Sequence, residues 1–209
     1  MKDKVIILDL DDTLISTHYR QYCCIHDYLV HEGKQFISFE AYFEMRRADN
    51  LSNTNLLTTL HIELDWEAFR TYYLHNVEAE NYLALDELIV EKYFLEAIVA
   101  KGFKLVLLSL RGNEENSLRQ IHHAGIDIFF ERIYFEKHEQ GTNPKLNRLQ
   151  ELNTEFDIVA FCGDSVSDYE AAQQLNINFV QVKTSLYQLP DFELARQFDN
   201  INQYFSTIL

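Results

Sequence analysis

Short, unbroken apolar runs alternate along the chain with stretches in which apolar residues recur every three or four positions. The runs have no polar face, which is typical of strands that are buried on both sides within a parallel sheet. We predict five such strands, over residues 5–8, 104–108, 132–135, 157–162 and 178–182. With the helical stretches between them, they predict an α/β fold: a Rossmann-like parallel five-stranded sheet flanked by helices.

A long helical stretch separates the first strand from the second. Its apolar spacing predicts helices over residues 18–31, 39–45, 53–60 and 66–77. A right-handed crossover between neighbouring parallel strands needs only one helix. We therefore predict an inserted helical domain, residues 16–85, within a core formed by residues 1–15 and 86–209.

The core pattern predicts further helices after the insertion. They cover residues 86–100 and 113–124, a stretch that starts near Lys145, and a closing helix or pair of helices over residues 192–205. These helices supply the two layers that a buried parallel sheet requires.

The first strand ends in three carboxylates, Asp9, Asp11 and Asp12. Like charges at the mouth of a buried strand repel one another and lose water, so a positive partner is expected. In open α/β sheets, ligands bind beyond the carboxyl ends of the strands, which places Asp9 and Asp11 where chemistry would occur. The alternative is a turn whose acids only cap the following helix.

The second strand ends at Ser109-Leu110-Arg111. A small hydroxyl and nearby backbone amides at such a position can donate hydrogen bonds to an anionic oxygen of a ligand. Serine is common at strand ends, so this signal has little weight by itself. Arg111 is either a ligand of phosphate or leaving group, or a solvated arginine.

Lys145 follows a Gly-Thr-Asn-Pro turn and falls in the first turn of a predicted helix. A cation there opposes the helix dipole, and such a local conflict indicates a functional residue. Free amides at a helix N-terminus also suit an anion. Lys137 is the alternative candidate for a lysine that contacts this anion. We favour Lys145 because it lies at the start of the helix.

The fourth strand runs into Gly163, which is followed by Asp164 and Asp168. Glycine permits a tight exit from the sheet. Together with Asp9 and Asp11, these carboxylates form an oxygen-rich set suited to Mg²⁺ that retains some of its waters. The alternative, that acids or serines here cap the next helix, is compatible with this role.

In their order along the chain, these segments resemble the motifs of the haloacid dehalogenase superfamily. Asp-x-Asp-x-Thr begins at Asp9, and Gly-Asp-x-x-x-Asp begins at Gly163. The resemblance implies that Asp9 attacks phosphorus and that Asp11 is the general acid and base. The family's dehalogenases lack the second aspartate, so its presence implies phosphoryl chemistry. Ser109 and Lys145 would then stabilise charge on the phosphoryl oxygens.

The resemblance also implies a metal site. Mg²⁺ would be bound by the Asp9 carboxylate, the Asp11 carbonyl oxygen and Asp164, with Asp168 binding through water or orienting Lys145. Thr13 resembles the residue that fixes the turn carrying Asp11. We assign Thr13, Leu110 and Arg111 to phosphate and substrate binding.

The helical insertion resembles the family's C1-type cap, which closes over the site and reads the leaving group. This resemblance rests on topology, that is, on a helical insertion directly after the first strand. Residues that could contact a leaving group, or belong to a solvated face, are Arg46, Arg47, Asn50, His18, Tyr19 and Arg20.

The net charge of −15, from 33 acids and 18 bases, argues against nucleic acid as a partner. A phosphoester can bind only if the site is locally positive, through a divalent cation and a few basic side chains. The chain shows neither a leader nor an apolar run of membrane length, and its three cysteines form no disulfide framework. We expect a cytoplasmic protein with no membrane partner, present as a monomer or small homo-oligomer.

The expected activity is Mg²⁺-dependent hydrolysis of a small phosphorylated metabolite through an aspartyl phosphate. Two alternatives stay open at this point: a phosphotransferase or mutase of the same family, and a phosphoacceptor signalling module of the receiver type. Receivers also combine acids, a hydroxyl and a lysine around Mg²⁺, but they place the accepting aspartate at a later strand and lack Gly-Asp-x-x-x-Asp. A catalytically silent member that acts through its cap is less compatible with the intact acids.

Overall fold

The structure is a computed structural model that describes residues 2–137, 139, 141–186 and 195–209. The chain forms two compact units. The core unit contains Met1–Ser16, Glu87–Ser185 and Leu189–Leu209, and the helical unit contains Thr17–Asp86 with Leu186–Gln188.

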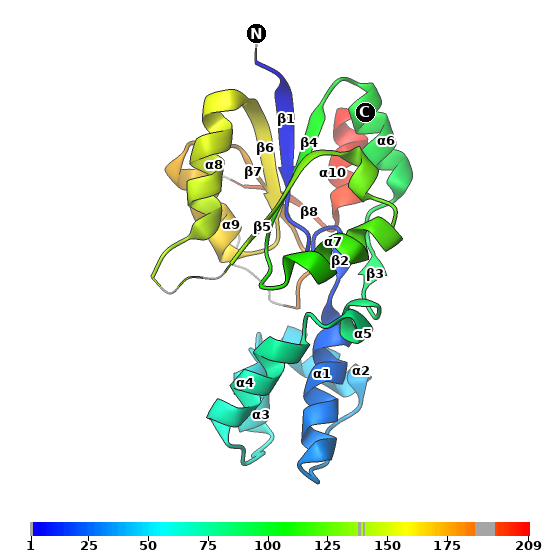
Figure 1. The fold of residues 1–209 in the computed structure, drawn as a ribbon, viewed down its shortest axis with the longest axis vertical. Coiled ribbons are helices and arrows are strands. Elements are labelled where there is room, and N and C mark those ends of the chain that lie inside the picture. The colour runs from blue at the N-terminus through cyan, green and yellow to red at the C-terminus, as the bar shows by residue number, and fades with distance from the viewer. Residues whose placement is uncertain (1, 138, 140, 187–194) are drawn as a thin grey trace. The chain divides into compact units, whose positions relative to one another are not determined.

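The core unit is built on a parallel sheet whose strand order is β5-β4-β1-β6-β7-β8 (Figure 1). The strands are β1 (Lys4–Leu8), β4 (Lys104–Leu110), β5 (Phe130–Glu136), β6 (Asp157–Gly163), β7 (Phe179–Val182) and β8 (Arg196–Phe198). Each pairs in parallel with its neighbours. The α/β prediction is confirmed, with six strands in place of the expected five.

The additional strand, β8, lies within the stretch predicted to be helical. It pairs with β7 at the edge of the sheet and is followed by α10 (Ile201–Ile208). Its three residues, Arg-Gln-Phe, are too few and too polar to show a strand period. The predicted stretch began at residue 192, and residues 192–194 lie outside the described part of the chain; in the described part, the closing helix begins later than expected, at Ile201.

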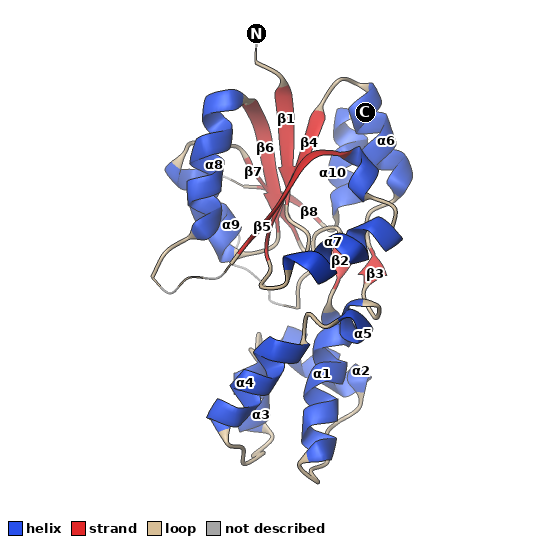
Figure 2. Cartoon of the chain, in the orientation of Figure 1, coloured by secondary structure: helices blue, strands red, loops and turns tan. Residues whose placement is uncertain are grey.

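Helices cover both faces of this sheet (Figure 2). On one face lie α8 (Pro144–Glu155) and α9 (Val166–Gln174); on the other lie α6 (Lys92–Ala100), α7 (Glu114–His123) and α10. Successive side chains of a strand point to opposite faces. A strand between two helical layers must therefore be apolar at every position, which explains the unbroken run in β1.

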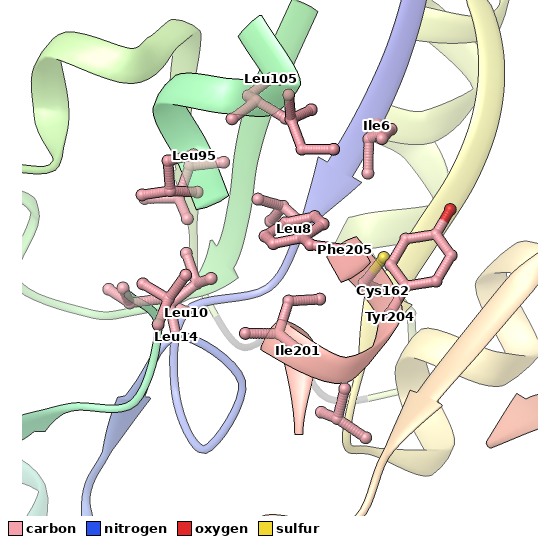
Figure 3. Close-up of a cluster of buried hydrophobic side chains, with 14 of the residues drawn as sticks. Ile6, Leu8, Leu10, Leu14, Leu95, Leu105, Cys162, Ile201, Tyr204 and Phe205 are labelled. Atoms are coloured by element: carbon pink, nitrogen blue, oxygen red, sulfur yellow. The ribbon is translucent and has the colours of Figure 1, made fainter. Parts of the chain in front are cut away.

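Strand β1 shows this division directly. Ile6 and Leu8 pack with α6 and α10 (Figure 3), whereas Val5 and Ile7 pack with α8 and α9. All four side chains are fully buried. Complete burial of such a side chain stabilises the fold by about 1.5–3 kcal/mol, so the end of β1 is firmly fixed.

The helix predicted over residues 86–100 begins later than expected, at Lys92. The residues before it form β3 (Glu87–Leu88), which pairs antiparallel with β2 (Ile15–Ser16). The carbonyl oxygen of Leu14 accepts hydrogen bonds from the backbone N–H groups of Ile89 and Val90, the two residues after β3, at 2.8 and 3.1 Å. These long-range backbone bonds override the local apolar pattern. The short helix α5 (Glu80–Leu83) and the 3-10 turn η1 (Asp127–Phe129) were not predicted either.

The helical unit matches the predicted helices closely. Besides α5 it contains α1 (His18–His31), α2 (Phe39–Ala48), α3 (Asn53–Thr59) and α4 (Trp66–Asn76). Asp65 caps α4 as expected, because its Oδ1 accepts hydrogen bonds from the next helical amides. None of the helices in the described residues combines the length and the apolar composition needed to span a bilayer.

A buried polar cluster lies inside the helical unit, around Arg46, which is 4% exposed. Its Nη1 donates to the Tyr42 hydroxyl at 2.7 Å and to Gln21 Oε1 at 3.0 Å, and its Nε donates to the Leu51 carbonyl at 2.9 Å. The Tyr42 hydroxyl in turn donates to Asn53 Oδ1 at 2.9 Å. The three acceptors in these bonds are neutral oxygens: a hydroxyl, a side-chain amide oxygen and a backbone carbonyl. We call these residues the Arg46 cluster.

Candidate active site

The loop after β1 brings the first acids to the carboxyl edge of the sheet. The backbone N–H of Asp9 still donates to the Cys162 carbonyl of β6, at 2.9 Å. The Leu10 carbonyl then accepts from the amides of Thr13, Leu14 and Ile15 at 3.3, 2.9 and 3.1 Å. Within this tight turn, Asp12 adopts a left-handed conformation with φ of 51°. The turn thus fixes the positions of the residues on either side of it.

Lys145 lies between two carboxylates at the same edge. Its Nζ donates to Asp9 Oδ1 at 2.6 Å and to Asp168 Oδ1 at 2.5 Å. The side chains of all three residues are at most 5% exposed. The structure therefore joins residues of β1, α8 and α9 in one buried ionic cluster. Of the two lysines considered from the sequence, Lys145 contacts Asp9 and Lys137 is exposed.

Burial and charge act in opposite directions on this cluster. Burial raises the pKa of Asp9 from 3.8 to about 7, although Lys145 opposes the rise. Burial by itself lowers the pKa of Lys145, but the carboxylates of Asp168 and Asp9 outweigh it and raise the pKa above its ordinary value. Lys145 therefore remains a cation inside the site.

Asp168 both caps the start of α9 and contacts Lys145. Its Oδ2 accepts from the Ser165 hydroxyl at 2.6 Å and from the Ser165 backbone N–H at 3.2 Å, while its own N–H donates to Ser165 Oγ at 3.2 Å. These bonds form a capping box, whose Ser-x-x-Asp spacing is visible in the sequence. The capping role and the Lys145 contact are both present.

Gly163 makes room for this arrangement. A Cβ atom built at residue 163 would lie 2.7 Å from Cγ of Asp168, far inside normal contact distance. Next to it, the Asn143 Nδ2 group donates to the Ser167 carbonyl at 2.8 Å and ties the start of α8 to the start of α9. Sequence reasoning did not identify Asn143 as a supporting residue.

Three acids form a group that fits a metal ion. Asp9, Asp164 and Asp168 each offer a carboxylate oxygen, and these oxygens lie within 4.8 Å of one another. Burial, together with the carboxylates of Asp9 and Asp12, raises the pKa of Asp164 well above its ordinary value. Three buried acids facing one lysine leave excess negative charge, which a hard divalent cation such as Mg²⁺ would neutralise.

Arg111 occupies an unexpected place. It is 2% exposed, which excludes the solvated alternative, and its Nε donates to Asp11 Oδ2 at 2.9 Å. Its Nη2 donates to the other oxygen, Oδ1, of the same carboxylate. The side chain that was expected to bind phosphate is thus paired with the expected acid and base.

The remaining predicted residues lie at or near the same edge. Ser109 is 1% exposed and lies two residues beyond Leu107, which pairs with Leu8 of β1. Leu110 is half-buried at the end of β4. Thr13 is fully buried, and its hydroxyl has no hydrogen-bond partner in the part of the chain that the structure describes.

The candidate leaving-group residues belong to the helical unit. Arg46 and Arg20 are buried there, Arg20 with its Nε 3.3 Å from Asp86 Oδ1. Tyr19, Arg47 and Asn50 are exposed, and His18 is half-buried.

Comparison with known proteins identifies the family. The model of the haloacid dehalogenase-like hydrolases matches residues 6–182. The chain belongs to the haloacid dehalogenase-like hydrolase family. The resemblance seen in the sequence motifs is thereby confirmed, and the receiver-type alternative is excluded.

Individual proteins with known names or structures are also similar to this chain. The chain is 29% identical over 146 residues to a phosphoglycolate phosphatase from Aquifex aeolicus, and the match spans 64% of each protein's length. The crystal structure of a predicted phosphoglycolate phosphatase from Haemophilus somnus 129PT has a TM-score of 0.71 at 21% identity, covering 100% of this chain and 99% of that one. The HAD-hydrolase YfnB from Bacillus subtilis, bound to magnesium, has a TM-score of 0.65 at 12% identity with the same coverage. At these identities, the two solved structures show a shared fold.

Proposed function

We propose that this protein is a Mg²⁺-dependent phosphatase that hydrolyses a small phosphomonoester through an aspartyl phosphate on Asp9. The observation that carries this proposal is the Lys145 bridge between Asp9 and Asp168, beside Asp164, at the ligand-binding edge of the sheet. Family membership and the phosphatase name of the Aquifex relative support it.

Two half-reactions follow from these positions. In the first, a carboxylate oxygen of Asp9 attacks phosphorus while Asp11 gives a proton to the departing ester oxygen. Lys145 holds Asp9 Oδ1, so we assign the attack to Oδ2. In the second, Asp11 takes a proton from water as the water oxygen attacks phosphorus, and the bond to Asp9 breaks.

The other site residues stabilise charge in both steps. The ammonium group of Lys145 and the hydroxyl of Ser109 are proposed to interact with the phosphoryl oxygens, where negative charge is spread in the transition state. Asp9, Asp164 and the Asp11 carbonyl oxygen would hold Mg²⁺, with Asp168 orienting Lys145. When bound, the ion supplies positive charge to the phosphoryl oxygens. We also assign Thr13 and Leu110 to the phosphate-binding loops.

The substrate and setting are proposed in general terms. The relatives named for phosphoglycolate favour a small phosphorylated metabolite, and we propose that the helical unit acts as a C1-type cap that reads its leaving group. All three cysteines are free thiols, which suits a reducing, cytoplasmic location. We expect a monomer or small homo-oligomer.

The proposal is tested with p-nitrophenyl phosphate. We expect wild-type hydrolysis to require Mg²⁺, to stop on chelation and to return when Mg²⁺ is restored. Asp9→Asn should lower kcat by about 10⁴-fold or more, because the nucleophile is lost. The matched control is Asp157→Asn, an exposed acid at the amino end of β6, which should retain wild-type activity. Near-normal turnover by Asp9→Asn would disprove the assignment.

Hydrolysis and transfer are separated by a second measurement. Acid-quenched wild-type protein should carry a phosphoryl group on the peptide that contains Asp9. With sugar acceptors added, a phosphatase releases inorganic phosphate at an unchanged rate, whereas a phosphotransferase or mutase forms a new phosphoester.

A further inference from the structure

The ion pair between Arg111 and Asp11 has a specific geometry. Nε of Arg111 addresses Oδ2 of Asp11 and Nη2 addresses Oδ1, so the planar guanidinium engages both carboxylate oxygens. Such two-point pairs fix direction as well as distance. The Arg111 side chain is 1% exposed, whereas that of Asp11 is 31% exposed. The arginine thus holds the acid from inside the protein, and the acid faces outward.

Helix α7 braces the guanidinium from behind. Nη1 of Arg111 lies 3.5 Å from Ser117 Oγ, and Nη2 lies 3.3 Å from Gln120 Oε1. The Arg111 backbone N–H donates to the Glu136 carbonyl of β5 at 2.9 Å. Both the main chain and the side chain of Arg111 are therefore held by neighbouring elements of the core unit.

The donors of Arg111 are directed at the protein. A guanidinium has five N–H groups, and four hydrogen bonds lead from that of Arg111 to oxygens of Asp11, Ser117 and Gln120. An arginine that binds phosphate would instead direct two of its N–H groups at the phosphoryl oxygens. The contacts are those of a residue that orients another side chain.

We propose that Arg111 is a positioning residue for Asp11: it sets the direction of the carboxylate and stabilises the negative charge that this group gains when its proton passes to the leaving group. The inference rests on the proposed function. In the first half-reaction, Asp9 forms a bond to phosphorus, and the bond between phosphorus and the ester oxygen breaks. At the same time, the proton of the Asp11 carboxyl group moves to the ester oxygen. The protonated carboxyl keeps one contact with Arg111, and the second is regained as the proton leaves. In this half-reaction, Arg111 thus interacts more strongly with the transition state than with the ground state, and in the second half-reaction its role is to hold the direction of the Asp11 carboxylate.

The test compares two substrates of similar shape, phenyl phosphate and p-nitrophenyl phosphate. The phenolate leaving group needs protonation more than the nitrophenolate does. In Arg111→Met, kcat/KM should fall about 100-fold for phenyl phosphate and about tenfold for p-nitrophenyl phosphate, since a positioned acid contributes roughly 10²–10⁴-fold. Arg111→Lys keeps the charge but not the fork and should recover only part of the loss.

Controls separate positioning from phosphate binding and from folding. Arg119→Met, which removes an exposed arginine of the same helix, should leave both substrates unaffected. Gln120→Glu keeps a hydrogen-bond acceptor for the buried arginine but offers Nη2 a carboxylate that competes with Asp11. It should therefore lower kcat/KM more for phenyl phosphate than for p-nitrophenyl phosphate. This variant tests the proposal even if the Arg111 variants fail to fold.

Two results would overturn the proposal while the proposed function stands. The first is that kcat/KM of Arg111→Met falls equally for both substrates, or does not fall. The second is that KM rises and inorganic phosphate inhibits the variant less strongly, which would make Arg111 a phosphate ligand. An inactive wild type would instead remove the proposed function. In solution, the Arg111 Nε–H resonance should be protected from exchange in the wild type and lose this protection in Asp11→Ala.

Discussion

The two units each bury a cation among polar groups, but they do so in different ways. In the core unit, Lys145 is enclosed by the carboxylates of Asp9 and Asp168, with Asp164 beside them. In the helical unit, the Arg46 cluster surrounds a guanidinium with amide, hydroxyl and carbonyl oxygens. Burial is similar at the two cations, at 3% and 4% exposure, whereas these acceptors differ in charge.

This difference supports the proposal that the Lys145 cluster is functional and the Arg46 cluster is structural. Buried like charges are costly, and a fold retains them where a positive ligand completes the set. In the Arg46 cluster, hydrogen bonds from one arginine to oxygens of the protein itself satisfy buried polar groups. The contrast therefore predicts that perturbing the first cluster changes chemistry and stability together, whereas perturbing the second changes stability.

The largest effect is expected for Lys145→Met. Removing the cation leaves buried carboxylates facing one another, so kcat should fall by about 10³-fold or more. Unfolding by denaturant should show a loss of about 3–5 kcal/mol. Lys137→Met removes an exposed lysine and should change neither quantity; equal effects of the two variants would contradict the assignment.

The stability of the metal-free protein should depend on pH through Asp9 in the core unit. The pKa of Asp9 rises from 3.8 to about 7 on folding, so in metal-free protein the folded state binds the proton more tightly than the unfolded state. Stability should therefore be greatest below pH 4 as far as Asp9 is concerned, and should decrease between about pH 4 and 7. Asp9→Asn should flatten this decrease in thermal melts, and an unchanged slope would refute the pKa assignment.

A smaller effect is expected for Arg46→Met in the helical unit. Losing the guanidinium leaves buried oxygens of Tyr42 and Gln21 with fewer donors, which should cost about 2 kcal/mol of stability. The stability loss should not vary with Mg²⁺. Arg47→Met, which removes an exposed neighbour, serves as the control in denaturant unfolding.

The smallest effect concerns the thiols, one deep in each unit. Burial raises the pKa of Cys24 to about 12, and burial likewise raises the pKa of Cys162 well above its ordinary value. At pH 8, neither should react with iodoacetamide until the protein unfolds. Mass spectrometry of labelled peptides checks this, and rapid labelling of one alone would show that the two interiors differ in water access.

The sequence predicted the features that depend on local pattern. Strand β1 is apolar at every position because both its faces are covered, and helix α1 begins and ends at the predicted residues. The placement of Lys145 followed from its conflict with the helix dipole, and the structure shows that conflict resolved by two carboxylates.

What escaped prediction depends on long-range contacts. Strand β8 is short and polar, and its pairing with β7 cannot be read from its own residues. The partner of Arg111, Asp11, is a hundred positions away in the chain. The residues next to Arg111 in the sequence do not show whether it binds phosphate or positions another side chain. The start of α6 was misplaced because the preceding residues bond to Leu14.

Gly163 contributes no side chain to the site, yet its missing methyl group is what allows Asp168 to stand against the strand. If codon 163 were randomised and the library selected for turnover, glycine alone should survive. The strictest requirement in the motif would then fall on a residue that never meets the substrate, since a single carbon there would displace the acid that steadies the lysine.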